Sequence, residues 1–156
     1  MALIAPALCQ TNTSDTGSAN MSATDWYLKG VDLFNHNSFA EAVQAYNESL
    51  NLNPMNEIVW NNRGAALGAM GNYEAAFYSF EEAAMINASY APAWYNMGVI
   101  YDMHGDYNDA IRVYNRATDA DPNYMNAWYN KDKDQDIVGI GHSSLYNELT
   151  GQPSSW

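Results

Sequence analysis

A tryptophan recurs at 34-residue spacing along most of this chain, at Trp26, Trp60, Trp94 and Trp128. In phase with them are glycines four residues later, alanines sixteen later and aromatic residues twenty later, at Gly30, Gly64, Gly98, Ala42, Ala76, Ala110, Tyr46, Phe80 and Tyr114. Self-similarity at a fixed period is the sequence signature of a repeat architecture. The chain is therefore built from repeating units of equal length.

Each unit is predicted to contain two amphipathic helices. In the second unit the apolar spacing i, i+4, i+7 that marks a helix face occurs twice, at Trp60, Gly64 and Leu67 and again at Ala76, Phe80 and Ala83. Gly71 and Gly105 lie between the two helices of their units, where a glycine can end a helix with a positive φ. Pro54 and Pro122 separate successive units, because proline cannot continue a helix. The repeating unit is a helix-turn-helix.

The small residues in the period indicate close packing of these helices. We expect the glycine of the first helix to lie opposite the alanine of the second, with the tryptophan and the later aromatic residue filling the surrounding space. A single hairpin cannot bury its whole apolar stripe, and stacking the next unit on it buries the rest. The predicted fold is an all-α solenoid.

The pattern W-x-x-x-G, then an aromatic, alanine, aromatic, alanine and proline at 34-residue spacing resembles the tetratricopeptide-repeat family. The resemblance covers residues 23–56, 57–90 and 91–124 in full, and 125 to about 139 in part. Three residues depart mildly from the pattern, at Asn37, Ser49 and Ala88. The resemblance implies a right-handed α-solenoid and a non-enzymatic scaffold that binds other proteins.

The two ends of the chain differ from the repeats. Asp132 occupies the close-packing glycine position of the fourth unit, so residues 125–156 are interpreted as a partial repeat with a capping helix over 125–138, a short final helix from Ser143 or Ser144 to about Thr150, and a tail. Residues 1–22 are predicted to be disordered. Their apolar start resembles the end of a secretory signal cleaved before Gln10, followed by a Ser/Thr/Asn-rich linker. This favours export, and a tail on a cytoplasmic protein is the alternative.

Charge and cysteine content exclude several classes of function. Eighteen acidic and six basic residues give a net charge of -12, which repels nucleic acid and favours a basic or neutral partner. The single cysteine cannot form an intramolecular disulfide or a thiolate cluster. No apolar run reaches the roughly 20 residues that cross a bilayer.

The sequence contains no constellation typical of catalysis or of a cofactor site. His36 and His104 occupy equivalent turns two repeats apart, so they cannot share a metal or a substrate atom. Asp132, Asp134 and Asp136 resemble the start of a calcium loop, but Ile137 stands where that loop needs glycine. We interpret the three aspartates as a solvated acidic helix face, with calcium binding as the alternative.

The resemblance implies a groove lined by the first helix of each repeat. The residues at the family's groove positions are Tyr27, Val31, Phe34, Asn61, Ala65, Gly68, Tyr95, Val99, Asp102, Tyr129 and Lys133. A row of asparagines at 34-residue spacing follows the tryptophans, at Asn62, Asn96 and Asn130. It resembles the ladder with which some members of the family hold a partner's backbone, and the alternative is a family preference unrelated to binding.

The predicted function is binding of a peptide or helix of a partner protein in this groove; self-association into homo-oligomers is the alternative. Family members that bind the acidic C-termini of chaperones use basic groove residues. The matching positions here are Tyr27, Val31, Asn62, Pro92 and Asn96, of which only Asn62 agrees. A chaperone-tail partner is therefore not expected.

Overall fold

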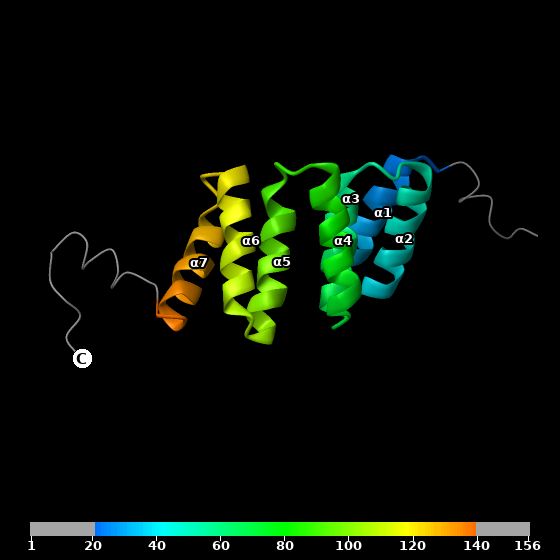
Figure 1. Ribbon diagram of the computed structural model, residues 1–156. Helices are drawn as coiled ribbons and strands as arrows, with labels where there is room; N and C mark the ends of the chain where they lie inside the picture. Colours follow the sequence, from blue (N-terminus) through cyan, green and yellow to red (C-terminus); the bar gives the residue numbers. More distant parts are fainter. Residues whose placement is uncertain (1–20, 140–156) are drawn as a thin grey trace, which may run out of the picture.

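The computed structural model describes residues 21–139, and within that range it contains seven helices and no strand. The helices are α1 (Ala23–Asn35), α2 (Phe39–Leu52), α3 (Glu57–Ala69), α4 (Tyr73–Ile86), α5 (Ala91–His104), α6 (Tyr107–Ala120) and α7 (Met125–Ile137). Figure 1 shows the helices stacked along one direction, with α1 and α2 at one end and α7 at the other. The predicted signal remnant, the linker up to residue 20 and the final short helix lie outside the described residues. Ser22 was included in the predicted disordered segment, but it is the N-cap of α1, and its Oγ accepts from the backbone N of Asp25 at 3.2 Å.

The turns inside the repeats follow the prediction made for them. Gly71 and Gly105 have φ angles of 78° and 81°, in the left-handed region that glycine reaches without strain. Asn37 takes the same place in the first repeat with φ of 60°, because a short amide side chain tolerates this conformation better than most residues. The departure at Asn37 therefore leaves the turn geometry intact.

Hydrogen bonds from the tryptophans stabilise the turns between repeats. The indole Nε1 of Trp60 donates to the backbone oxygen of Pro54 at 2.8 Å, and that of Trp94 donates to Ala88 at 2.9 Å. Trp128 makes the same contact with Pro122 at 3.0 Å. Because the acceptor is a backbone oxygen, alanine serves at position 88 as well as proline does elsewhere.

One packing expectation was wrong. The phased glycines Gly30, Gly64 and Gly98 lie opposite the aromatic residue of the second helix and not opposite its alanine. A Cβ atom on Gly64 would lie 2.6 Å from Cε1 of Phe80, and one on Gly98 would lie 2.4 Å from Cε1 of Tyr114. The flat ring needs more space than an alanine methyl group, so the ring is what requires glycine across from it.

The first helix of each repeat also packs on the repeat before it. Ala66 of α3 belongs to a buried cluster with Ala42 and Tyr46 of α2. Ile100 of α5 belongs to the next cluster, with Leu67 and Phe80 of the second repeat. The core is therefore a chain of apolar clusters that cross the repeat boundaries, as expected for a solenoid. In the described part of the chain no helix is both long and apolar enough to cross a membrane.

Candidate functional site

Four of the predicted groove residues line one pocket between α1 and α3. The pocket has a volume of about 210 Å³, and it is lined by Val31, Phe34, Asn35, Tyr46, Asn62 and Ala65. The sequence interpretation missed Asn35 and Tyr46. Tyr46 was assigned to the core, and with 1% of its surface exposed it belongs there too. Burial raises the pKa of Tyr46 to about 12, because the charged phenolate would be poorly solvated there.

The asparagine row connects neighbouring repeats. Asn96 Nδ2 on α5 donates to Asn61 Oδ1 on α3 at 2.9 Å, and Asn130 Nδ2 on α7 donates to the Tyr114 hydroxyl at 3.2 Å. Asn62 Nδ2 contacts the Tyr27 hydroxyl at 3.5 Å. Each carboxamide thus uses a donor for a contact with the preceding repeat. Asn61 is only 8% exposed, so this predicted groove residue contributes mostly to that contact.

The predicted groove tyrosines differ in their surroundings. Tyr27 packs near Tyr46, and Tyr95 lies between Tyr114 and Tyr124, with ring centroids 5.3–6.3 Å apart. Tyr129 on α7 is 73% exposed. The three tyrosines therefore do not form one uniform surface, and the most accessible ring is at the α7 end.

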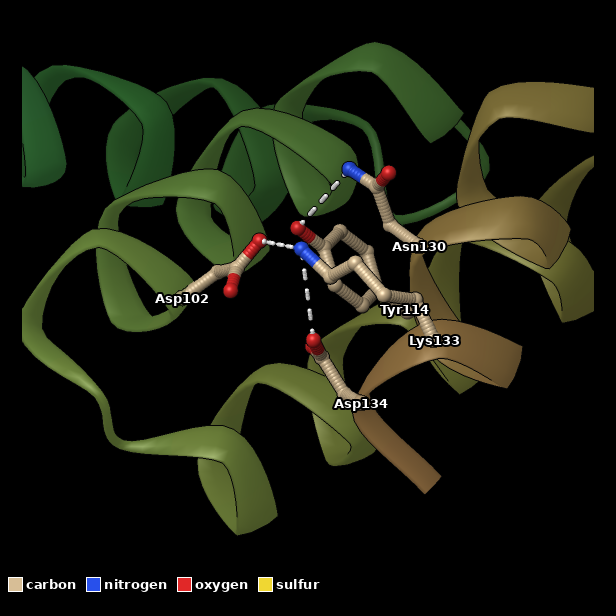
Figure 2. Close-up of polar contacts among 5 residues, drawn as sticks. All are labelled: Asp102, Tyr114, Asn130, Lys133 and Asp134. Carbon is tan, nitrogen blue, oxygen red and sulfur yellow. Dashed lines mark hydrogen bonds and ion pairs between the residues drawn. The ribbon is translucent and has the colours of Figure 1, made fainter. Parts of the chain in front are cut away.

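Three charged residues meet where α5 faces α7, as Figure 2 shows. Lys133 Nζ on α7 donates to Asp102 Oδ2 on α5, and it lies 3.5 Å from Asp134 Oδ1. The exposed fraction of the side chain falls from 39% for Lys133 to 19% for Asp102 and 0% for Asp134. The hydrogen bond to Asp102 is the main reason that the pKa of Lys133 is raised. We call these three residues the charged triad.

Asp134 contradicts the interpretation of a solvated acidic face. Residues two positions apart on an α-helix are rotated by about 200° from each other, so Asp132 and Asp134 cannot share a face. Asp134 occupies the repeat position that Ala66 and Ile100 hold in the two preceding repeats. The 34-residue period was therefore the sequence signal that could have predicted the burial of Asp134. Among the described residues no three acidic, histidine or cysteine side chains are placed to hold a metal ion.

Asp134 is buried without hydrogen bonds. Neither carboxylate oxygen has a hydrogen-bond partner in the described range. Burial raises the pKa of Asp134, and repulsion from Asp102 adds to the effect, while Lys133 opposes it. A buried carboxylate in this state destabilises the fold relative to an apolar residue.

All six basic residues lie in the described part of the chain, and each has a partner there. Four of them stack on the repeated tryptophans: Lys29 on Trp26, Arg63 on Trp60, Arg116 on Trp94 and Lys131 on Trp128, with the charged group 3.5–6.0 Å from the ring centroid. Arg112 pairs with Asp109, and Lys133 pairs with Asp102. The only base at a predicted groove position is thus Lys133, and it is paired within the chain.

The two histidines of the described repeats are held by their own helices. The Nδ1 atoms of His36 and His104 lie 2.8 Å and 2.7 Å from the backbone oxygens of Asp32 and Ile100, one turn earlier. The structure therefore does not bring them together.

A row of helix pairs with clusters shared across every repeat boundary defines the chain as a helical-repeat protein. Sequence profiles described as "Tetratricopeptide repeat" match residues 58–90 and 91–124, and one described as "TPR repeat" matches residues 30–71. The protein belongs to the tetratricopeptide-repeat family. No curated protein sequence matches it.

Solved structures share the fold. The TPR domain of Sgt2 from Aspergillus fumigatus is similar, with a TM-score of 0.70 and 20% identity over 86% of each chain. The first TPR of Spaghetti (RPAP3), bound to the HSP90 peptide SRMEEVD, has a TM-score of 0.71 and 22% identity over 76% of this chain and 94% of that one. MamA has a TM-score of 0.72 and 19% identity over 79% and 72%. At these identities the likeness concerns the fold alone.

Proposed function

We propose that this protein is an interaction module that binds an extended segment of a partner protein along the first helices of its repeats. The observation that carries this proposal is the pocket between α1 and α3, where four residues predicted from two different repeats line one hollow. We propose no catalytic role. A preformed pocket with a few polar groups at its edge is the usual form of a specific binding site.

The chemistry of the pocket suggests how it would be used. Val31, Phe34 and Ala65 offer apolar surface, and the amides of Asn35 and Asn62 offer donors and acceptors beside it. An apolar side chain of the partner would fill the hollow while its backbone bonds to the amides. Such an arrangement gives affinity through one buried anchor.

The test is selection of peptides from a displayed random library of about twelve residues with the full chain. Ala65→Leu fills the pocket, and we expect it to weaken binding of the selected peptides by about tenfold or more. Ala88→Leu is the matched control, because Ala88 is exposed in the connection between α4 and α5. Equal binding by the wild type and Ala65→Leu, with unchanged thermal midpoints, would rule out this pocket as the site.

Self-association is the second candidate, and the exposed apolar residues of α7 favour it. Met125 and Tyr129 are 70% and 73% exposed, and Trp128 and Ile137 are also exposed. Sedimentation velocity of the full chain over a wide concentration range tests this candidate. A monomer at every concentration would remove it, and an oligomer dissociated by Tyr129→Ser would support it.

A further inference from the structure

We propose that the charged triad is a binding site for a lysine or arginine side chain of the bound peptide, and that Lys133 occupies this site in the free protein. The inference rests on the proposed function, because it concerns the same helices, and it adds the chemistry of the partner. In this view Asp102 and Asp134 provide the site, and Lys133 is a built-in occupant that a partner's cation displaces.

The buried carboxylate of Asp134 is not satisfied by hydrogen bonds. Asp134 is fully buried, both of its oxygens lack hydrogen bonds in the described range, and the nearest charged nitrogen is 3.5 Å away. Buried polar groups in folded proteins are nearly always hydrogen-bonded. An aspartate in this condition, at a repeat position that carries Ala66 or Ile100 in the two preceding repeats, has acceptors that the described chain leaves without a hydrogen-bond donor. Residues that break a packing rule in this way are expected at functional sites.

The charged triad carries an excess of negative charge. Two carboxylates face a single ammonium group, so the triad has a net charge of -1. Lys133 is bound mainly to Asp102, and with 39% of its side chain exposed it can swing away into solvent. A guanidinium group carries five donors in a rigid fork, and it can reach two carboxylates at once where the Lys133 ammonium reaches one well. A cation that displaces Lys133 would therefore donate hydrogen bonds to carboxylate oxygens that Lys133 leaves without a donor.

The charge of the whole chain also favours a cationic partner. A net charge of -12 attracts a basic segment, and the other five basic residues all have partners on tryptophans or on Asp109. The only base at a predicted groove position that could bind a peptide carboxylate is Lys133, and it is already paired with Asp102. A cationic side chain is therefore favoured over an anionic one.

The experiment compares two displayed libraries of about twelve random residues, one with a fixed central arginine and one with a fixed central glutamine. The wild type is expected to recover the arginine library about tenfold better. Asp102→Asn should abolish this preference. Glu81→Gln is the matched control, because it makes the same charge change on an exposed residue of α4 and should leave the preference unchanged.

Lys133→Gln separates a binding role from a merely structural one. Removing the built-in occupant should increase recovery of the arginine library several-fold, a result that partial unfolding cannot produce. Unchanged or reduced recovery by Lys133→Gln, or equal recovery of both libraries by the wild type, would overturn the inference. If the glutamine library is still recovered and Ala65→Leu weakens that recovery, the proposed function stands without this inference. Recovery of neither library would overturn both.

Discussion

One repeat position is apolar in the inner interface, between α3 and α5. The same position is charged in the outer interface, between α5 and α7. Ile100 of α5 packs in an apolar cluster with Leu67 and Phe80 of the preceding repeat. Asp134 of α7, one repeat later, is buried as fully but carries a carboxylate without hydrogen bonds. The inner interface is apolar at this position, whereas the outer one buries a carboxylate, which lowers stability relative to an apolar residue.

The first repeat shows why the position matters only in an interface. Asp32 of α1 occupies the same repeat position, and 73% of its side chain is exposed, because the described chain places no repeat before α1. An aspartate lowers stability little at that position, since water solvates its charge. At Asp134 the preceding repeat buries the carboxylate, and the same residue type therefore lowers stability there.

The largest expected effect comes from making the inner interface resemble the outer one. Ile100→Asp places an unpaired carboxylate in the apolar cluster, and we expect it to lower the free energy of unfolding by about 3–5 kcal/mol. Chemical denaturation followed by circular dichroism measures this. Asp32→Ala is the control and should change stability by less than about 0.5 kcal/mol. A loss below about 1 kcal/mol for Ile100→Asp would show that the inner interface tolerates charge as the outer one does.

A second test probes how tightly the inner repeats are packed. Gly64→Ala would place its Cβ 2.6 Å from the Phe80 ring, and we expect a loss of about 1–3 kcal/mol from overpacking. Gly68→Ala on the same helix meets only an ordinary contact, 3.9 Å from Ala76. That control should gain about 0.5–1 kcal/mol, because alanine is the better helix former. Similar shifts for both variants would refute the assignment of Gly64 to ring packing.

The converse substitution makes the outer interface resemble the inner one. Asp134→Ile replaces the buried carboxylate with the residue of the preceding repeat, and we expect a gain of about 1–2 kcal/mol in the free energy of unfolding. The same variant should lose the preference for the arginine library. A loss of stability would instead show that the charged triad holds α7 in place.

The smallest effect is a pH dependence. The folded-state pKa of Asp134 is raised above 3.8, so the cost of its buried charge is present above that raised value and disappears as pH falls below 3.8. Asp134→Asn should therefore be more stable than the wild type at neutral pH, by about 1 kcal/mol. Thermal midpoints measured from pH 7 to pH 3 should show this advantage shrinking. A difference that stays constant with pH would contradict burial as its cause.

Much of the fold could be predicted because it depends on local and periodic signals. The 34-residue period, the helix spacing around Trp60 and the turn glycines Gly71 and Gly105 each follow from short-range stereochemistry. The glycine packing was predicted wrongly, since a period shows that Gly64 and Phe80 recur together but not which side chains touch. Val31 and Ala65, which line the pocket, were named as groove residues from their family positions, whereas Asn35 and Tyr46 of the same pocket were not.

The sequence by itself determined that this protein is an all-α tetratricopeptide-repeat protein, because its period, helix spacing and turn residues agree with one another along three units. Only the tertiary structure decided what the charges do. Alternating aspartates near the C-terminus predicted a solvated face, whereas packing of α7 against α5 and α6 buries Asp134 and brings Lys133 to Asp102. The physical reason is that the cost or use of a charge depends on its solvent exposure and its neighbours, which are set by contacts between residues distant in the chain.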